Sequence, residues 1–131
     1  MKLNESMENY LETILLLNKD GHVRSIDIAR HLKFSKASVS VAMRNLIDKE
    51  FIIIDGNGYI TLTKLGLWIA KTTLEKHDNL IEMLVSLGVD EKQASIEACG
   101  IEHQISDKTL ALLKEHFKKH KELLEFYNKH R

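Results

Sequence analysis

The chain has 131 residues, enough for one compact body or a small domain with an attached second half. Its 19 lysine and arginine residues balance 19 aspartate and glutamate residues, so the overall charge favours no class of partner. The single cysteine excludes an internal disulfide and fits a reducing cytosol. No apolar run approaches the roughly 20 residues that cross a bilayer, and no secretion signal is recognisable, so we expect a soluble cytoplasmic protein without membrane contact.

Helical spacing dominates the first fifty residues. Apolar residues recur every three or four positions from Met7 to Leu17, and this predicted helix stops at Gly21. A second helix is predicted in "SIDIARHL", with Ser25 as its N-cap. After a short break at "KFS", a third helix is predicted in "KASVSVAMRNLIDKE", with an apolar stripe made of Val39, Met43, Leu46 and Ile47.

The stretch "FIIIDGNGYITLT" changes the period from helical to extended. Two β-leaning runs flank a turn from Asp55 to Gly58, and glycine and asparagine accept the positive φ that tight turns demand. Two helices joined by a tight turn and followed by a β-hairpin make a winged helix-turn-helix. We therefore expect this arrangement, with a two-stranded wing, in residues 1–72.

The rest of the chain, residues 73–131, is predicted to be helical. A long helix should run to about Gly88, with Leu65, Trp68 and Val85 on its apolar side. Polar residues that typically begin helices stand at the expected starts of three helices: Thr63, Asp90 with Gln93, and Ser106 with Asp107. The fold class expected is therefore mainly α, with a winged helix-turn-helix followed by a helical domain.

The third predicted helix suits contact with DNA. From Arg24 to Lys49 there are six basic and two acidic residues, whereas residues 73–131 hold nine basic and eleven acidic residues. The second helix of such a pair enters the major groove, and the hairpin lies along the DNA backbone or minor groove. Hydroxyl and basic side chains suit phosphates, and alanine suits a thymine methyl group, so double-stranded DNA contacts are expected from Ser35, Lys36, Ala37, Ser38, Ser40, Arg44, Asn57 and Tyr59. Alternatively, the winged helix docks protein, and the serines serve only as caps.

The stretch "EACGIEH" places three chemically distinct groups on one helix face. Cys99, Glu102 and His103 stand at positions i, i+3 and i+4, so their side chains can converge on one point. A thiolate, a carboxylate and an imidazole form a mixed set that suits a divalent transition ion better than magnesium or calcium. The plainer reading is that the cysteine is a small buried side chain and that its polar neighbours are incidental.

Four stretches, "SMENYLETILLL", "IARHLKFSKASVSVAMRNL", "EKHDNLIEMLVSLGVDE" and "EACGIEH", resemble the metal-dependent repressors of the diphtheria toxin repressor and manganese transport regulator family. The resemblance covers nearly the whole chain, and the length is similar to that of the short form without an SH3-like domain. It implies a homodimer whose second half, residues 73–131, binds metal and dimerises. The metal would bind between the first helix and the dimerisation helices, and the metal-loaded form would repress metal-uptake genes.

Carried over to this sequence, the family's ligand positions fall on Asn9, Glu12, His77, Cys99, Glu102 and His103. Glu12 is the residue that the manganese branch carries at this position and that the iron branch lacks. Cys99, in contrast, stands where the manganese branch has a glutamate, and it matches the iron-branch pattern. Asn9 fits neither branch, although its amide can offer a carbonyl oxygen. Because a thiolate is a soft ligand, Fe²⁺ is favoured, with Mn²⁺ still open and Zn²⁺ or Co²⁺ as substitutes. The number of ions stays open.

Other functions fit parts of the pattern. A metal-independent winged-helix dimer would use Cys99 as a structural residue, and a redox sensor would use it as a reactive thiol, although no second cysteine is present to resolve it. A zinc ion with a purely structural role is a further alternative. Enzyme activity on a small organic substrate is not expected, since a mid-helix cysteine has no obvious oxyanion donors beside it.

Overall fold

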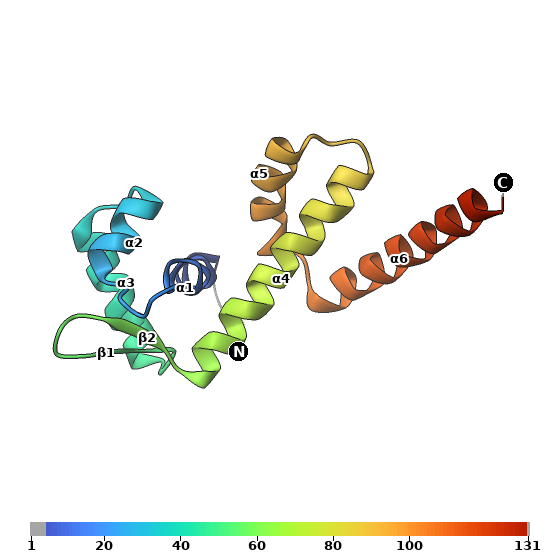
Figure 1. The fold of residues 1–131 in the computed structure, drawn as a ribbon. Coiled ribbons are helices and arrows are strands. Elements are labelled where there is room, and N and C mark those ends of the chain that lie inside the picture. Colours follow the sequence, from blue (N-terminus) through green and yellow to red (C-terminus); the bar gives the residue numbers. More distant parts are fainter. Residues whose placement is uncertain (1–4, 131) are drawn as a thin grey trace. The chain divides into compact units, whose positions relative to one another are not determined.

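The computed structural model describes residues 5–130, so residues 1–4 and 131, at the outer ends of the two predicted domains, lie outside the described residues. The chain divides after Leu74 into two compact units. In chain order the elements are α1 (Glu5–Leu17), α2 (Ser25–Leu32), α3 (Lys36–Asp48), β1 (Ile52–Ile54), β2 (Ile60–Leu62), α4 (Lys64–Ser86), α5 (Glu91–Glu102) and α6 (Asp107–Lys129) (Figure 1). The expected fold class, a winged helix-turn-helix followed by helices, is confirmed.

The turn between α2 and α3 is short because both of its ends are capped. Lys33 closes α2 in the left-handed conformation, at φ 60°. Ser35 then begins α3, and its Oγ accepts a hydrogen bond of 3.1 Å from the backbone N–H of Ser38. The predicted N-cap of α2 is wrong by one residue: Arg24 is the N-cap, and its backbone N–H donates to the carboxylate of Asp27 over 2.9 Å.

The predicted hairpin is confirmed as the wing. β1 and β2 pair antiparallel, with Ile52 opposite Leu62 and Ile54 opposite Ile60. Asp55 organises the turn, since its Oδ1 accepts hydrogen bonds from the backbone N–H groups of Asn57 and Tyr59, at 2.8 and 3.0 Å. Gly58 takes the positive φ, 83°, that the turn requires.

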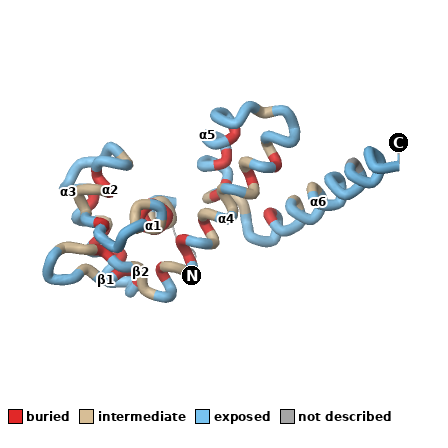
Figure 2. The backbone as a smooth tube through the Cα atoms, viewed as in Figure 1, coloured by how far each residue is buried: buried red, intermediate tan, exposed pale blue. Residues whose placement is uncertain are grey.

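The first unit has a hydrophobic core of its own. Its buried residues come from α1, α2, α3, the wing and the first half of α4 (Figure 2). With Phe51, which directly precedes β1, the fully buried side chains include Leu11, Ile14, Ile28, Val39, Leu46 and Ile60. At the start of α4, Thr63 accepts a hydrogen bond from the backbone N–H of Gly66, as expected of a cap. The buried Gly66 then lies directly against the backbone of Phe51.

The second unit packs α5 and the beginning of α6 against the second half of α4. Its core consists of Leu80, Met83, Ala98 and Leu110, with Phe117 partly buried against them. The predicted caps are confirmed, because the side chain of Asp90 accepts from the N–H of Gln93 and that of Ser106 accepts from the N–H of Thr109. Beyond Phe117 the described side chains of α6 are exposed (Figure 2).

Part of the predicted apolar stripes lies on the surface. Ile47 of α3 and the α4 residues Leu65, Trp68 and Val85 are exposed rather than buried, and Trp68 keeps 65% of its surface accessible. Apolar spacing identifies a face that can be buried but does not supply the element that covers it. None of the described helices combines the length and the apolarity that a bilayer-spanning segment needs.

Candidate metal centre and nucleic-acid interface

Three potential metal ligands meet at the end of α5. The thiol sulfur of Cys99, a carboxylate oxygen of Glu102 and a ring nitrogen of His103 all lie within 4.8 Å of one another. Glu102 is the last residue of α5, and His103 keeps a near-helical backbone at φ −88° as its C-cap. The helical spacing therefore extends through His103 and keeps the three side chains on one face.

Glu102 is the centre of this cluster and is almost fully buried, with 1% of its surface exposed. Its Oε1 lies 3.0 Å from Nε2 of His103, and its Oε2 lies 3.0 Å from Nδ1 of His77 on α4. The side chain of His103 is completely covered, and that of His77 is mostly covered. A carboxylate is costly to bury unless positive charge or donors surround it, so this site favours a cation.

The approach of His77 to Glu102 supports the same inference. Its Nδ1 is buried and 3.0 Å from the carboxylate oxygen, but the two atoms lack the alignment of a hydrogen bond. An imidazole lone pair and a carboxylate oxygen repel each other at this distance unless a proton or a cation lies between them or beside them. The donor set of oxygen, nitrogen and sulfur fits a divalent transition ion.

Cys99 differs from Glu102 and His103, the other two residues of the cluster, because it is exposed. This exposure argues against the alternative in which the thiol is a plain core residue, since Ala98 beside it fills the core position instead. The two remaining expected ligands, Asn9 and Glu12, stand three residues apart on α1 in the first unit, where Glu12 is buried and Asn9 is partly buried.

The residues expected to contact DNA are mostly on the surface of the first unit. All six on or just before α3 are exposed, and Asn57 is exposed in the wing turn: Ser35, Lys36, Ala37, Ser38, Ser40, Arg44 and Asn57. Tyr59 is partly buried, because the guanidinium of Arg24 covers its ring, with the guanidinium carbon 4.5 Å from the ring centroid.

A small hollow adds a residue that the sequence reasoning missed. Its volume is about 290 Å³, and Ser25 and Ile26 of α2 line it together with Lys36 and Ser40 of α3. One ammonium and two hydroxyl groups near the N-terminal ends of two helices suit a phosphate, which accepts hydrogen bonds and carries negative charge. A hydroxyl residue at the start of the first helix of the pair was the available signal.

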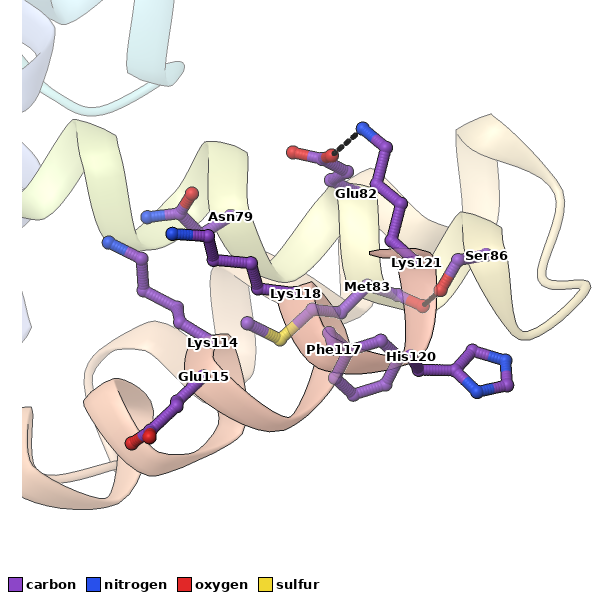
Figure 3. A pocket seen from close by; sticks show the side chains of 10 residues that line it. All are labelled: Asn79, Glu82, Met83, Ser86, Lys114, Glu115, Phe117, Lys118, His120 and Lys121. Atoms are coloured by element: carbon purple, nitrogen blue, oxygen red, sulfur yellow. Dashed lines mark hydrogen bonds and ion pairs between the residues drawn. The ribbon is translucent and has the colours of Figure 1, made fainter. Parts of the chain in front are cut away.

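A larger groove lies between α4 and α6 in the second unit, with a volume of about 710 Å³ (Figure 3). Met83 and Phe117 form an apolar floor, while Lys114, Lys118 and Lys121 stand along α6. Lys121 approaches Glu82 of α4 to 3.9 Å across the groove. An apolar centre with a charged rim is typical of a surface that contacts protein rather than of a metal site.

Two domain families match the chain. "Iron dependent repressor, N-terminal DNA binding domain" matches residues 2–59, and "Iron dependent repressor, metal binding and dimerisation domain" matches residues 63–123. An uncharacterized HTH-type transcriptional regulator of Methanocaldococcus jannaschii is 35% identical over 123 residues, which are 92% of this chain and 98% of that protein. The chain belongs to the iron-dependent repressor family.

Two further relatives agree with this family. The HTH-type transcriptional regulator MntR of Bacillus subtilis is 34% identical over 102 residues, which are 77% of this chain and 72% of MntR. A solved structure of a manganese-dependent transcriptional repressor in complex with manganese is 25% identical, with a TM-score of 0.77 over 84% of this chain. This chain spans about half of that structure's length, 51%.

As a member of the iron-dependent repressor family, the protein is a metal-responsive, DNA-binding transcriptional repressor. Its N-terminal matched region is the family's DNA-binding domain, and its C-terminal matched region is the domain that binds metal and dimerises. These relatives are transcriptional regulators, not enzymes. The resemblance inferred from the sequence is confirmed.

Proposed function

We propose that this repressor uses one divalent transition ion as co-repressor, held in the second unit by His77, Cys99, Glu102 and His103. The observation that carries the proposal is the buried carboxylate of Glu102, 3.0 Å from a ring nitrogen of each histidine. The family resemblance adds Asn9 and Glu12 of α1 as the ligands contributed by the first unit. We assign DNA binding to residues 1–72, and metal binding with homodimerisation to residues 73–131.

The donor chemistry supports Fe²⁺ as the native ion. A thiolate from Cys99 would favour iron, cobalt, nickel or zinc over manganese, which prefers oxygen ligands. Zn²⁺ and Co²⁺ should substitute for Fe²⁺, and Mn²⁺ is the competing candidate because MntR is among the relatives. Cys99 and His103 must both lose protons before they ligate, so metal affinity should fall as the pH is lowered.

The DNA side of the proposal rests on the exposed first turns of α3. Lys36, Ser40 and Arg44 follow one another at helical spacing and are all exposed, so they can line a groove of the duplex together. The hollow beside Lys36 and Ser40 would accept a backbone phosphate. The proposed targets are operators upstream of metal-uptake genes.

Metal would act by restricting geometry. In a two-fold dimer the two α3 helices must match half-sites separated by about one helical turn, roughly 34 Å, or a multiple of it. A bound ion supplies positive charge that ligands from both units can share. If ligands on α1 and α5 bind the same ion, the dimer populates fewer separations of its α3 helices. Apparent DNA affinity then rises by the inverse of the fraction of metal-free dimers whose α3 separation fits the DNA.

Metal addition tests this function directly. The full chain is stripped with a chelator, and its binding to a duplex selected from a random-sequence library by the metal-loaded protein is followed at fixed salt. Fe²⁺, Co²⁺ or Mn²⁺ should strengthen binding by about tenfold or more, within the range of typical allosteric couplings. Mg²⁺ should not, because it prefers an all-oxygen site. Equal binding by the stripped and the loaded protein would contradict the proposal.

Replacing Cys99 with glutamate tests the choice of metal. The substitution exchanges a soft ligand for a hard one, so the ratio of Mn²⁺ affinity to Co²⁺ affinity should rise. We expect a rise of about tenfold or more, since changes around a bound ion typically alter its affinity by that much. Competition titrations against a chromophoric chelator measure both constants. Cys99→Ala is the matched control, since it removes the thiol without adding an oxygen and should lower the affinity for both Mn²⁺ and Co²⁺. An unchanged ratio in Cys99→Glu would show that residue 99 does not touch the ion.

A further inference from the structure

The segment that joins α1 to α2 is fixed against the wing. The backbone N–H of Ile60 in β2 donates a 2.7 Å hydrogen bond to the carbonyl of Val23, and both side chains are buried. In an extended segment successive side chains point to opposite faces, so His22 and Arg24 share the face that Val23 does not. The two residues therefore flank the same part of β2.

Both side chains contact the ring of Tyr59, the residue directly before β2. The guanidinium carbon of Arg24 lies 4.5 Å from the ring centroid, and the imidazole of His22 approaches it with centroids 4.9 Å apart and planes inclined at 58°. An arginine over an aromatic ring gains cation–π attraction and loses side-chain freedom. The ring thus holds an otherwise mobile charge in one place.

Stacking occupies only the face of the guanidinium. Its N–H groups point outward in the plane, where they can form paired hydrogen bonds with a phosphate. Within residues 5–130 no carboxylate forms an ion pair with this guanidinium, and Arg24 is exposed. The next residue, Ser25, lines the hollow shared with Lys36 and Ser40 of α3, so Arg24 borders the surface expected to face DNA.

We infer that Arg24, seated on Tyr59, binds a phosphate of the DNA backbone and so ties the wing to the start of α2 in the bound state. Tyr59 is then a positioning residue rather than a direct DNA contact. The ligand is a phosphodiester, so this contact adds affinity without base specificity. The inference rests on the proposed function, because it requires that the first unit binds duplex DNA.

The salt dependence of binding tests this contact. Metal-loaded full-length protein is titrated against the library-selected duplex over a series of salt concentrations. Each phosphate contact contributes about 0.9 to the slope of log K against log salt, so Arg24→Gln should lower the slope by about 0.9 per subunit. Affinity near 0.1 M salt should fall roughly tenfold per subunit. Arg30→Gln, the same charge change at an exposed site in the last turn of α2, is the matched control and should keep the slope.

The role of Tyr59 is tested by repeating Arg24→Gln in two backgrounds. Tyr59→Phe keeps the ring, so the fold-loss caused by Arg24→Gln should equal that in the wild-type background. Tyr59→Leu removes the ring, so the same substitution should cost several-fold less, which is the signature of two coupled residues. A merely structural tyrosine would give equal losses in both backgrounds and would overturn the positioning role.

The outcomes separate this inference from the proposed function. If wild-type protein shows metal-stimulated DNA binding but Arg24→Gln has the same slope as wild type and Arg30→Gln, the phosphate contact is wrong and the metal-responsive function stands. If the wild-type protein binds DNA equally with and without metal, the metal-responsive function is wrong and the slope of Arg24→Gln still decides the phosphate contact. If the wild-type protein binds no duplex under either condition, both are overturned.

Discussion

Glu102→Gln lowers the affinity for Fe²⁺, Co²⁺ or Mn²⁺ by about 100-fold and removes the metal-stimulated gain in DNA binding. The change is nearly isosteric, but it replaces a buried negative charge with a neutral amide that has a single acceptor oxygen. In the native site one carboxylate oxygen faces His77 and the other faces His103, each at 3.0 Å. Changes around a bound ion typically lower its affinity by about 10- to 100-fold, and the loss should lie at the upper end of this range because Glu102 is almost fully buried.

Isothermal titration with Co²⁺ measures the affinity, and fluorescence anisotropy with the selected duplex measures the gain. Glu97→Gln is the matched control: it makes the same change on the same helix at an exposed residue whose carboxylate, among the described residues, accepts only a side-chain hydrogen bond from Gln93. The control should stay within about twofold of the wild type, as expected for a surface substitution. Should both variants bind Co²⁺ like the wild type, Glu102 does not ligate the ion.

Gly66→Ala lowers the free energy of unfolding of the first unit by about 3 kcal/mol, the upper range for overpacking. A Cβ at residue 66 would lie 2.0 Å from the carbonyl oxygen and 2.9 Å from the carbonyl carbon of Phe51. Neither partner can yield easily, because that oxygen accepts a hydrogen bond from the N–H of Thr63 and the N–H of Phe51 donates to Leu46. Relief requires α4 to move away from Phe51, which strains the hydrogen bond from Thr63.

Urea unfolding followed by circular dichroism measures the loss, with the slope against denaturant checked for constancy. Gly100→Ala provides the opposite control. Gly100 lies inside α5, and nothing lies within 4 Å of where its Cβ would be, so alanine should stabilise the second unit by roughly 0.5–1 kcal/mol. A Gly66→Ala protein as stable as the wild type would mean that α4 and the backbone of Phe51 are not in close contact in solution.

The sequence predicted the elements well because local chemistry decides where they start and stop. Ser35, Asp90 and Ser106 cap helices through contacts with backbone groups three residues away, and such contacts are visible as residue types at fixed spacing. The convergence of ligand atoms at the end of α5 has the same local origin, since one helical turn brings them together. The N-cap of α2 was misplaced because the Asp27 carboxylate, and not a hydroxyl at residue 25, makes the capping contact.

Long-range contacts explain what the sequence could not predict. Nothing in the spacing of His77 and Glu102 indicates that two different helices bring them within 3.0 Å, and only the family resemblance suggested that pair. The stacking of Arg24 on Tyr59 depends on the strand-like path of the segment before α2, which no local pattern encodes. Trp68 belongs to the apolar side of α4 and yet is exposed, because periodicity marks an apolar face whether or not anything covers it.

Glu102 is buried only in the folded chain, so metal binding and folding are coupled equilibria. An ion that binds the folded chain but not the unfolded one raises its stability by RT ln(1 + [L]/Kd), which is about 2.7 kcal/mol at a concentration 100 times Kd. Melting temperature therefore becomes an assay for the physiological ion that needs no operator sequence. By the same mass action, a larger fraction of metal-free chains is unfolded at any time. Proteases in the cell should therefore degrade the metal-free repressor faster than the metal-loaded one.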